Sequence, residues 1–510
     1  MSIETCLIVD FGSQYTQLIA RKLRELGVFS TLVTPDFSEE LLKDPDIKGI
    51  ILSGGPSSVS DQDAPQLTVG LKQIEIPVLG ICYGMQWITK EFGGQVVAGH
   101  AREYGVEKIR VKAGRLFPSD AEEEVLLSHG DHVAKLPESF LAVAQSKNAV
   151  IAAMEHESKK IFGLQFHPEV HHTKNGKQIL HNFLKLSGFS FNWQADHILE
   201  EIKEWLKTRY QEGGILCALS GGVDSTVLAV LLNRLFPGEV QCFCVDTGLL
   251  RKNEIGQLKE LFEKHLHFPI EVVDAESRFL QDLKEVTDPE QKRKIIGQDF
   301  VEIFEAESKK RSSIRYLAQG TLYPDLIESR SAHGGPSVKI KTHHNVGGLP
   351  ENLSFDLLEP FSFLFKDEVR RLGKFLGIPH EFVWRHPFPG PGLAVRILGE
   401  VNSDRLSILR EADWRLQEVL KESGWYEKLW QSFCVYLPVR SVGVMGDHRT
   451  YEETIAVRCV HSEDGMTAHI AALPVDVLER VSARIINEVN GINRVVYDIS
   501  SKPPSTIEWE

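Results

Sequence analysis

Short apolar runs alternate with amphipathic stretches along most of the chain. In the first part, residues 7–10, 49–52 and 77–81 are continuous apolar runs of the kind found in buried parallel strands. Residues 17–26 have apolar positions at helical spacing, and Gly27 follows where a helix would end. Strands that alternate with helices in this way predict an α/β domain with a parallel sheet.

A second series of the same kind follows a break in composition at residues 188–196. Apolar runs at 214–219, 240–245, 269–273 and 314–318 predict a second parallel sheet. The break lacks this periodicity and is interpreted as a linker. The sequence therefore predicts two α/β domains in succession.

A cluster of proline and glycine, HPFPGPG at 386–392, ends the second series. Beyond it, residues 454–460 alternate as a half-exposed strand, 474–490 carry one apolar helical face, and 494–499 form another strand-like run. This pattern predicts a smaller α+β unit. The expected domains are residues 1–187, 197–385 and 386–510, with 188–196 as the linker.

Composition and charge place the chain among ordinary globular proteins. Its 510 residues are 42% hydrophobic and 25% charged, which excludes a disordered or fibrous protein. The net charge of −14 argues against general binding of nucleic acid. The apolar stretches are shorter than the roughly 20 residues that a membrane span needs, and the N-terminus does not have the pattern of a signal peptide. Seven cysteines without a CxxC pair indicate reduced thiols. We therefore expect a cytoplasmic protein without nucleic-acid or membrane partners.

Cys82 lies in the pentapeptide GICYG at 80–84, where a buried strand meets a helix. Small flanking residues permit a sharp turn that exposes the thiol at the helix N-terminus, where the helix dipole favours a thiolate. The alternative is a buried structural cysteine in a tight turn. The pentapeptide alone does not separate the two interpretations.

The tripeptide His167-Pro168-Glu169 follows a strand-like run at 161–166. Residues two apart on a strand face the same side, so His167 can act as a general base while Glu169 orients its ring. Alone, this tripeptide is more often a surface turn. Its presence in the same domain as the cysteine turn favours a catalytic triad.

A glycine-rich loop, SGGVDST at 220–226, follows the strand at 214–219 and opens an apolar helix. Its glycines let the backbone close on an anion, and the hydroxyls of Ser225 and Thr226 lie at the helix N-terminus. It lacks the Gly-Lys-Ser/Thr ending of a Walker loop. A capped turn without a ligand is the alternative. Asp224, the only acidic residue of the loop, is the candidate ligand for Mg²⁺.

Other candidate residues follow later strands of the same sheet. Asp246 lies at the carboxyl end of a strand, where it either contacts a ligand or caps the turn. Residues 319–325 follow the fourth strand in the same way. The basic segment 341–348 contains His343 and His344, but adjacent histidines rarely converge on one ion. We therefore expect no zinc site there.

The first domain resembles the class I, or triad, glutamine amidotransferases. The motifs that carry the resemblance are SGGP at 53–56, CYGMQ at 82–86 and HPE at 167–169. The resemblance implies a flavodoxin-like fold and glutamine hydrolysis through a thioester. It also assigns roles to single residues: catalytic Cys82, His167 and Glu169, oxyanion-binding backbone groups of Gly55 and Tyr83, and glutamine-binding Gln86.

The loop of the second domain resembles the pyrophosphate loop of N-type ATP pyrophosphatases, which adenylate a substrate and release pyrophosphate. The resemblance implies an adenine-nucleotide α-hydrolase-like fold, with ATP as co-substrate and Mg²⁺ as cofactor at Asp224. The expected ATP-binding residues are Ser220, Gly221, Gly222, Val223, Asp224, Ser225, Thr226 and Asp246.

With HPFPGPGLA at 386–394 and KPPSTIEWE at 502–510, the whole chain resembles the glutamine-hydrolysing GMP synthase family. The resemblance implies amination of xanthosine monophosphate (XMP) to GMP through adenylyl-XMP, with glutamine and ATP as the other substrates. It also implies a C-terminal dimerisation domain and a homodimer. The expected XMP-binding residues are Asp325, Lys341, Arg396, Asp447, Lys502, Thr506 and Glu508.

Two alternatives stay open at this point. Another adenylating amidotransferase, such as an NAD or asparagine synthetase-like enzyme, would share the phosphate loop, although the triad and the tail at 502–510 count against it. A catalytically inactive relative that acts as a binding protein is disfavoured by the intact Cys82, His167 and Glu169.

Overall fold

The computed structural model describes residues 3–311, 313–331, 355–445, 448–462, 465 and 467–510. The chain divides into two compact units, Met1–His197 and Ile198–Glu510. The division falls inside helix α4 (Ala195–Arg209), next to the predicted linker at 188–196. The three-domain division predicted from the sequence stays a prediction.

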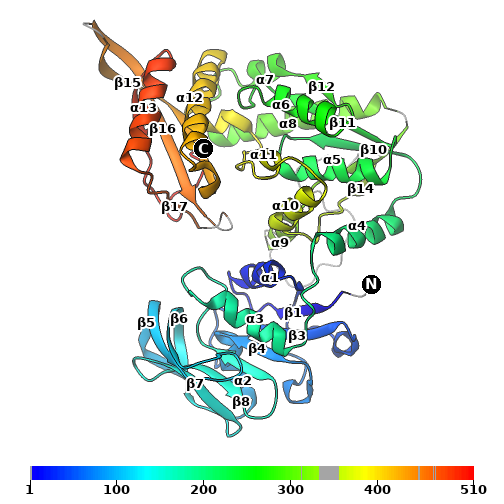
Figure 1. Ribbon diagram of the computed structural model, residues 1–510, viewed down its shortest axis with the longest axis vertical. Helices are drawn as coiled ribbons and strands as arrows, with labels where there is room; N and C mark the ends of the chain where they lie inside the picture. Colours follow the sequence, from blue (N-terminus) through cyan, green and yellow to red (C-terminus); the bar gives the residue numbers. More distant parts are fainter. Residues whose placement is uncertain (1–2, 312, 332–354, 446–447, 463–464, 466) are drawn as a thin grey trace. The chain divides into compact units, whose positions relative to one another are not determined.

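The first unit is built on a nine-stranded sheet in the order β2-β1-β3-β4-β9-β8-β7-β5-β6 (Figure 1). Its first five strands are parallel: β1 (Thr5–Val9), β2 (Phe29–Val33), β3 (Ile47–Leu52), β4 (Val78–Ile81) and β9 (Ile161–Leu164). This half confirms the predicted parallel sheet. The helices are α1 (Thr16–Glu25), α2 (Tyr83–Glu91) and α3 (Gly176–Leu186).

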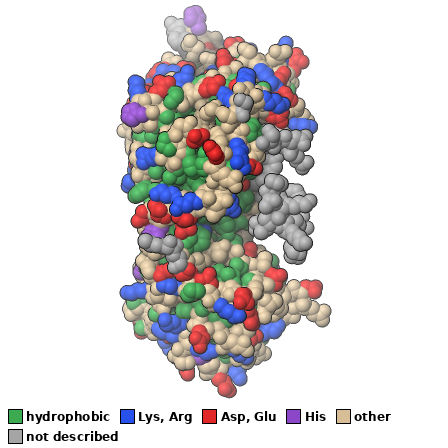
Figure 2. Space-filling model, turned by 90° about the vertical axis from the view of Figure 1, so that its right-hand side faces the viewer, with side chains coloured by type: hydrophobic (Ala, Val, Ile, Leu, Met, Phe, Trp, Pro, Cys, Tyr) green, Lys and Arg blue, Asp and Glu red, His purple; other side chains and the backbone are tan. Residues whose placement is uncertain are grey.

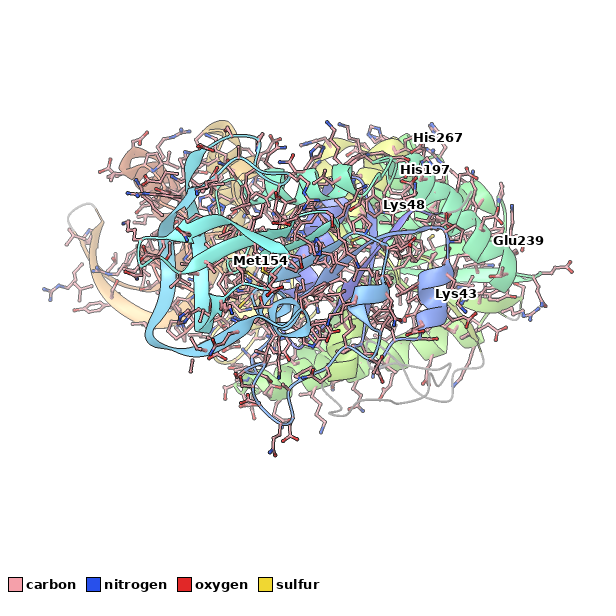
Figure 3. The ribbon with its side chains drawn as sticks, turned by 90° about the horizontal axis from the view of Figure 1, so that it is seen from below. Lys43, Lys48, Met154, His197, Glu239 and His267 are labelled. Atoms are coloured by element: carbon pink, nitrogen blue, oxygen red, sulfur yellow. The ribbon has the colours of Figure 1, made fainter. Side chains whose placement is uncertain are left out.

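Four antiparallel strands, which the sequence analysis did not predict, extend this sheet. They are β5 (Gln95–Val111), β6 (Ala121–Lys135), β7 (Phe140–Ser146) and β8 (Ile151–His156). Met154 of β8 lies within the body of the unit (Figure 3) and is fully buried with residues of α2 in one apolar core. The extension is therefore part of the same domain.

The second unit begins with a five-stranded parallel sheet in the order β12-β11-β10-β13-β14. Its strands are β10 (Gly214–Leu219), β11 (Val240–Asp246), β12 (Glu271–Asp274), β13 (Ile314–Ala318) and β14 (Asp356–Leu358). The strand order runs outward in both directions from β10 and β13, so a topological switch point lies between them. Ligands bind at such points in open α/β sheets. Among the described residues, the α-helices of this part are α5 (Val223–Leu235), α6 (Glu254–Glu260), α7 (Glu276–Asp282), α8 (Pro289–Lys309), α9 (Tyr323–Ser331), α10 (Lys366–Phe375) and α11 (His380–Val383).

The rest of the second unit is the predicted α+β part. A long antiparallel pair, β15 (Gln431–Met445) and β16 (His448–His461), is flanked by β17 (His469–Ile470) and by β18 (Ile492–Tyr497), which runs parallel to β16. Its helices are α12 (Ser403–Glu422) and α13 (Val475–Glu488). Buried apolar residues of β11, α8, α12 and β16 belong to one continuous core, so the two parts pack together.

One face of the molecule carries side chains of both charges (Figure 2). Lys and Arg side chains are interspersed with Asp and Glu on the face shown in Figure 2. Within the described part of the chain, none of the helices combines the length and apolar character that crossing a bilayer requires.

Candidate active sites

Cys82 occupies a strained turn between β4 and α2. Its φ of 52° and ψ of −105° lie outside the regions that non-glycine residues usually adopt, and such strain is found at functional sites. The backbone N–H of Cys82 donates to the Leu164 carbonyl at 2.7 Å. A Cβ at Gly84 would lie 2.4 Å from the Leu52 carbonyl oxygen, and one at Gly80 would lie 2.5 Å from Gly84. The turn therefore requires both glycines, as a nucleophile elbow does.

His167 and Glu169 form a buried pair beside this turn. The Nδ1 of His167 lies 2.7 Å from Oε1 of Glu169, and both side chains are at most 5% exposed. The prediction that a strand carries both residues is wrong, because β9 ends at Leu164. Instead, a turn carries them, and the Thr173 hydroxyl stabilises it by donating to the His167 carbonyl at 2.6 Å.

The neighbouring parallel strands explain why these side chains meet. Ile81 of β4 is in register with Leu164 of β9, so Cys82 and His167 both follow the same edge of the sheet. Burial alone would lower the pKa of His167. The charge of Glu169 and hydrogen bonds to Cys82 and Glu169 outweigh it and raise this pKa well above its usual range. An imidazolium beside the sulfur supplies the positive charge that a thiolate nucleophile needs.

A polar cavity of about 630 Å³ opens over the cysteine. Gly55, Tyr83, Gln86 and His167 line it together with Cys82. Tyr83 is the first residue of α2, and the first N–H groups of a helix have no intrahelical partner. Every residue that the sequence assigned to glutamine hydrolysis therefore lines this cavity except Glu169, which is paired with His167.

Gln86 is engaged in a way that the sequence did not predict. Its side-chain amide donates to the Asp131 carbonyl of β6 at 2.9 Å and lies 3.4 Å from Oε1 of the fully buried Gln165. Gln165 in turn donates to the Cys82 sulfur at 3.8 Å. Gln165 belongs to none of the motifs used above. Its position two residues before His167 is the feature of the sequence that could have identified it as a site residue.

The phosphate loop joins β10 to α5 at the switch point of the second sheet. Gly221 has a φ of +75°, and Gly222 is the N-cap of α5. The Ser225 hydroxyl accepts from the Ser220 N–H at 3.3 Å, and the Thr226 hydroxyl donates to the Gly222 carbonyl at 2.9 Å. The loop is thus folded over a helix N-terminus, which is the geometry of an anion site.

Asp224 lies in the first turn of α5. Its Oδ2 is 3.4 Å from the Lys366 ammonium, and its Oδ1 is buried without a hydrogen-bond partner among the described residues. A buried carboxylate oxygen with no partner next to a phosphate loop fits a role in holding Mg²⁺. Lys366, at the start of α10, was not singled out in the sequence.

Two of the other predicted residues make local hydrogen bonds. Oδ1 of Asp246 accepts from the Gly248 N–H at 3.1 Å, which is the capping role that the sequence left open. Oδ2 of Asp325 accepts from the Leu322 N–H at 2.9 Å at the start of α9. Lys341 and Asp447 lie outside the described residues. The roles of all four toward ATP or XMP stay predictions.

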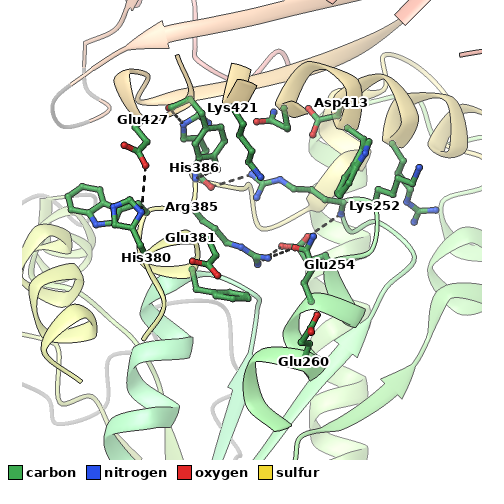
Figure 4. A pocket seen from close by; sticks show the side chains of 18 of the residues that line it. Lys252, Glu254, Glu260, His380, Glu381, Arg385, His386, Asp413, Lys421 and Glu427 are labelled. Atoms are coloured by element: carbon green, nitrogen blue, oxygen red, sulfur yellow. Dashed lines mark hydrogen bonds and ion pairs between the residues drawn. The ribbon is translucent and has the colours of Figure 1, made fainter. Parts of the chain in front are cut away.

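Arg385 supports the phosphate loop from a neighbouring cavity of about 670 Å³ (Figure 4). It donates to the Gly221 carbonyl at 3.4 Å and to Oε1 of Gln257 at 2.6 Å. The Glu254 carboxylate, which is also buried, lies 3.5 Å away. Burial lowers the pKa of Arg385, and the charge of Glu254 opposes this. No sequence motif marks Arg385, because its partners are distant along the chain.

The C-terminal tail is folded onto the second unit. Glu508 accepts two hydrogen bonds from Arg396, at 3.0 and 2.8 Å, and one from Gln431 at 2.7 Å. Arg396 is fully buried, and its Nη1 has no partner among the described residues. The structure therefore joins two residues that the sequence placed separately in the XMP region.

Lys502 and Thr506, the other two predicted residues of the tail, point toward backbone groups. The Lys502 ammonium donates to the Gly465 carbonyl at 2.8 Å, and the Thr506 hydroxyl donates to the Glu508 carbonyl. The fully buried Arg458 donates to the carbonyls of Thr506 and Ile507. The alternative of a disordered tail is therefore wrong for residues 502–510.

Three family models match separate parts of the chain. Residues 7–186 match the family "Glutamine amidotransferase class-I", 200–291 match "Asparagine synthase" and 418–509 match "GMP synthase C terminal domain". A solved structure from Thermoplasma acidophilum, described as a putative GMP synthase component, is 32% identical. It covers 37% of this chain and 95% of its own, with a TM-score of 0.35.

Full-length relatives are also similar over the whole chain. Proteins named GMP synthase [glutamine-hydrolyzing] from Nitratiruptor sp. and Aquifex aeolicus are 54% and 53% identical, each over 99% of both chains. The same name is given to a Wolinella succinogenes protein that is 53% identical over 99% of this chain and 98% of its own. This chain therefore belongs to the glutamine-hydrolysing GMP synthase family.

Proposed function

We propose that the two units divide the reaction of this family, the glutamine- and ATP-dependent conversion of XMP to GMP. The observation that carries the first half is the buried His167 and Glu169 pair beside the strained Cys82, at the edge of a polar cavity. The phosphate loop at the switch point of the second sheet supports the other half.

In the first unit, the Cys82 sulfur attacks the side-chain amide carbon of glutamine. The developing oxyanion lies on the backbone N–H groups of Gly55 and Tyr83, whose fixed positions cost no reorganisation. His167 gives its proton to the departing amide nitrogen. Ammonia is released, and a thioester remains on Cys82. His167 then takes a proton from the attacking water, and glutamate leaves. Glu169 orients the imidazole throughout.

In the second unit, O2 of XMP attacks the α-phosphorus of ATP, so that an O–P bond forms and the bond to pyrophosphate breaks. Residues 220–226 hold the leaving pyrophosphate through backbone N–H groups and hydroxyls. Asp224 would hold Mg²⁺, which neutralises phosphate charge when bound. Ammonia then attacks C2, loses a proton and displaces AMP, which yields GMP. Adenylation thus converts a poor leaving oxygen into a good one.

We assign the acceptor to the region around the tail. The buried Arg396, whose Nη1 is unpartnered among the described residues, and the Glu508 bound to it are the best-supported contacts. Lys502 and Thr506 belong to the same folded tail. Asp325, Lys341 and Asp447 complete the proposed set on the basis of the sequence alone.

A homodimer and a cytoplasmic location are part of the same proposal. The paired strands β15 and β16 extend beyond α12 and α13 (Figure 1), and large apolar side chains on them are exposed. Val439 is 61% exposed, Val444 is 74% and Tyr451 is 58%. Several exposed apolar side chains on one hairpin are a feature of protein interfaces, which supports pairing of two copies through this hairpin.

The deciding experiment is product analysis by chromatography with XMP, Mg-ATP and glutamine, repeated with an ammonium salt. We expect GMP, AMP and pyrophosphate in equal amounts with either nitrogen source. Pyrophosphate release with deamido-NAD or aspartate in place of XMP would favour another adenylating amidotransferase. Absence of glutaminase activity would favour a binding protein.

A further inference from the structure

Lys292, in the first turns of α8, is a fully buried lysine. Lysine is almost never fully buried unless it is paired. An ammonium has three N–H donors, and Lys292 has three acceptors: the carbonyls of Ala394 and Ile397, at 3.2 and 2.7 Å, and the Glu510 carboxylate. Every donor is therefore used.

These three acceptors lie on the two segments that carry Arg396 and Glu508. Ala394 and Ile397 are on either side of Arg396 in the chain, and Glu510 follows Glu508 by two residues. One ammonium thus binds both the backbone around Arg396 and the end of the tail. It fixes the spacing between the two members of the Arg396 and Glu508 pair.

The tail makes further contacts that also hold Glu510 in place. The other Glu510 carboxylate oxygen accepts from the Gly399 N–H at 3.3 Å, and Arg293 of α8 donates to the Glu510 carbonyl. Burial lowers the pKa of Lys292, and the hydrogen bond and charge of Glu510 offset this lowering only in part. Without Glu510 the charged form, which can donate to all three acceptors, would be less favourable still.

Stability alone does not explain this arrangement. A buried ion pair contributes little net stability compared with apolar side chains of similar volume. Its geometry, however, is specific, because each acceptor must meet one donor. A displacement of a binding group by about 1 Å can reduce activity by about a hundredfold, so a contact that fixes Arg396 and Glu508 has a direct use.

We propose that Lys292 is a positioning residue for the acceptor site, which it sets through Glu510 and through the carbonyls next to Arg396. This inference rests on the proposed assignment of XMP to Arg396 and Glu508. Lys292 reaches the acceptor only through these two residues. Its effect therefore falls on XMP and leaves ATP and glutamine unaffected.

The test uses Lys292→Met, Glu510→Gln and their combination in the full chain, with saturating ammonium salt as the nitrogen source. We expect each single variant to raise KM for XMP by about tenfold, which is the usual size of a lost charge-assisted contact. KM for ATP and uncoupled glutaminase activity should stay within about twofold of the parent. The double variant should be no worse than the more impaired single variant, because both changes remove one interaction. Lys294→Met, at an exposed lysine of the same helix, is the matched control.

Three outcomes would overturn the proposal: unchanged KM for XMP in Glu510→Gln, equal increases for XMP and ATP, or additive effects in the double variant. If Lys292→Met does not fold, Glu510→Gln alone tests the positioning role, because glutamine keeps the size of the glutamate side chain. Arg396→Gln separates this inference from the assignment on which it rests. If Arg396→Gln raises KM for XMP but Glu510→Gln does not, the positioning role of Lys292 is wrong, whereas the assignment of XMP to Arg396 is retained. If Arg396→Gln raises KM only for ATP, the acceptor assignment itself is wrong.

Discussion

The cysteine site and the phosphate-loop site both follow the carboxyl ends of parallel strands, but their charged groups are arranged differently. At the cysteine site, His167 and Glu169 are paired at 2.7 Å and nearly fully buried. At the phosphate loop, Asp224 is 3.4 Å from Lys366, and its Oδ1 has no partner among the described residues.

The difference follows from the two kinds of chemistry. Proton transfer by His167 requires groups within hydrogen-bond distance before the substrate arrives. Phosphoryl transfer depends mainly on neutralising charge that the substrate brings, so under the proposed function we expect partners for Asp224 to arrive with the nucleotide. The first site is therefore assembled in advance, whereas we expect the second to be completed by its ligands.

The strongest test of this separation is Cys82→Ala. We expect glutamine-dependent GMP formation to fall at least about a thousandfold, because the variant has no nucleophile. Ammonia-dependent formation should be nearly unchanged, since the phosphate loop lies in the other unit. Initial rates of GMP formation from each nitrogen source give the answer.

Cys6→Ala is the matched control, because Cys6 is a fully buried cysteine of β1 in the same sheet. It should retain glutaminase activity. Equal loss from both nitrogen sources in Cys82→Ala would instead assign Cys82 a structural role or a role in adenylation.

Glu169→Gln tests whether the first site depends on its preassembled pair. The charge of Glu169 is the largest of the causes that raise the pKa of the buried His167, so its removal should lower that pKa. The active imidazolium then loses its proton at lower pH. We expect kcat for glutamine hydrolysis to fall by about a hundredfold or more, and the alkaline limb of its pH profile to move to lower pH.

Glu122→Gln is the control, because Glu122 is 54% exposed and pairs with Lys108 on the surface. Its pH profile should match that of the parent. A Glu169→Gln profile with reduced height but an unmoved alkaline limb would mean that Glu169 orients the ring without setting its pKa.

Asp224→Asn tests whether the phosphate-loop site, unlike the cysteine site, depends on a bound metal ion. If the Asp224 oxygen helps to hold Mg²⁺, the amide should raise the Mg²⁺ concentration needed for half-maximal pyrophosphate release by about tenfold. The effect should be the same with glutamine and with ammonia. Mg²⁺ titrations of pyrophosphate release measure it, with Asp356→Asn, an exposed carboxylate of β14 in the same sheet, as the control. An unmoved titration would remove Asp224 from the metal site.

The two sites also differ in how well the sequence predicts them. The cysteine turn and the phosphate loop are each contained in seven residues or fewer, and local glycines and hydroxyls determine their shape. The contact of His167 with Glu169 was predicted, but through a strand that ends at Leu164. Sequence patterns cannot separate a strand end from the turn after it, because both leave residues two apart close together.

Contacts between distant segments could not be predicted. Arg385 reaches Gly221 across 164 residues, and Lys292 reaches Glu510 across 218. A single arginine or lysine carries no information about such a partner. The antiparallel strands β5 and β6 escaped prediction for another reason: they are 17 and 15 residues long, rich in charged residues, and partly exposed, so no apolar run marks them.

Arg385→Gln should have the smallest effect. It tests whether the phosphate loop needs the support of a residue outside the loop. The variant loses the donor to Gly221 and leaves the buried Glu254 without its closest cation. We expect KM for ATP to rise about threefold to tenfold and the thermal midpoint to fall by a few degrees, from a cost of about 1–2 kcal/mol. KM for glutamine should not change.

Arg315→Gln, at a 46% exposed arginine of β13, is the control and should match the parent in both measurements. A lower thermal midpoint with unchanged KM for ATP would show that the loop keeps its shape without Arg385. The helix N-terminus and the two glycines would then be sufficient to form the anion site.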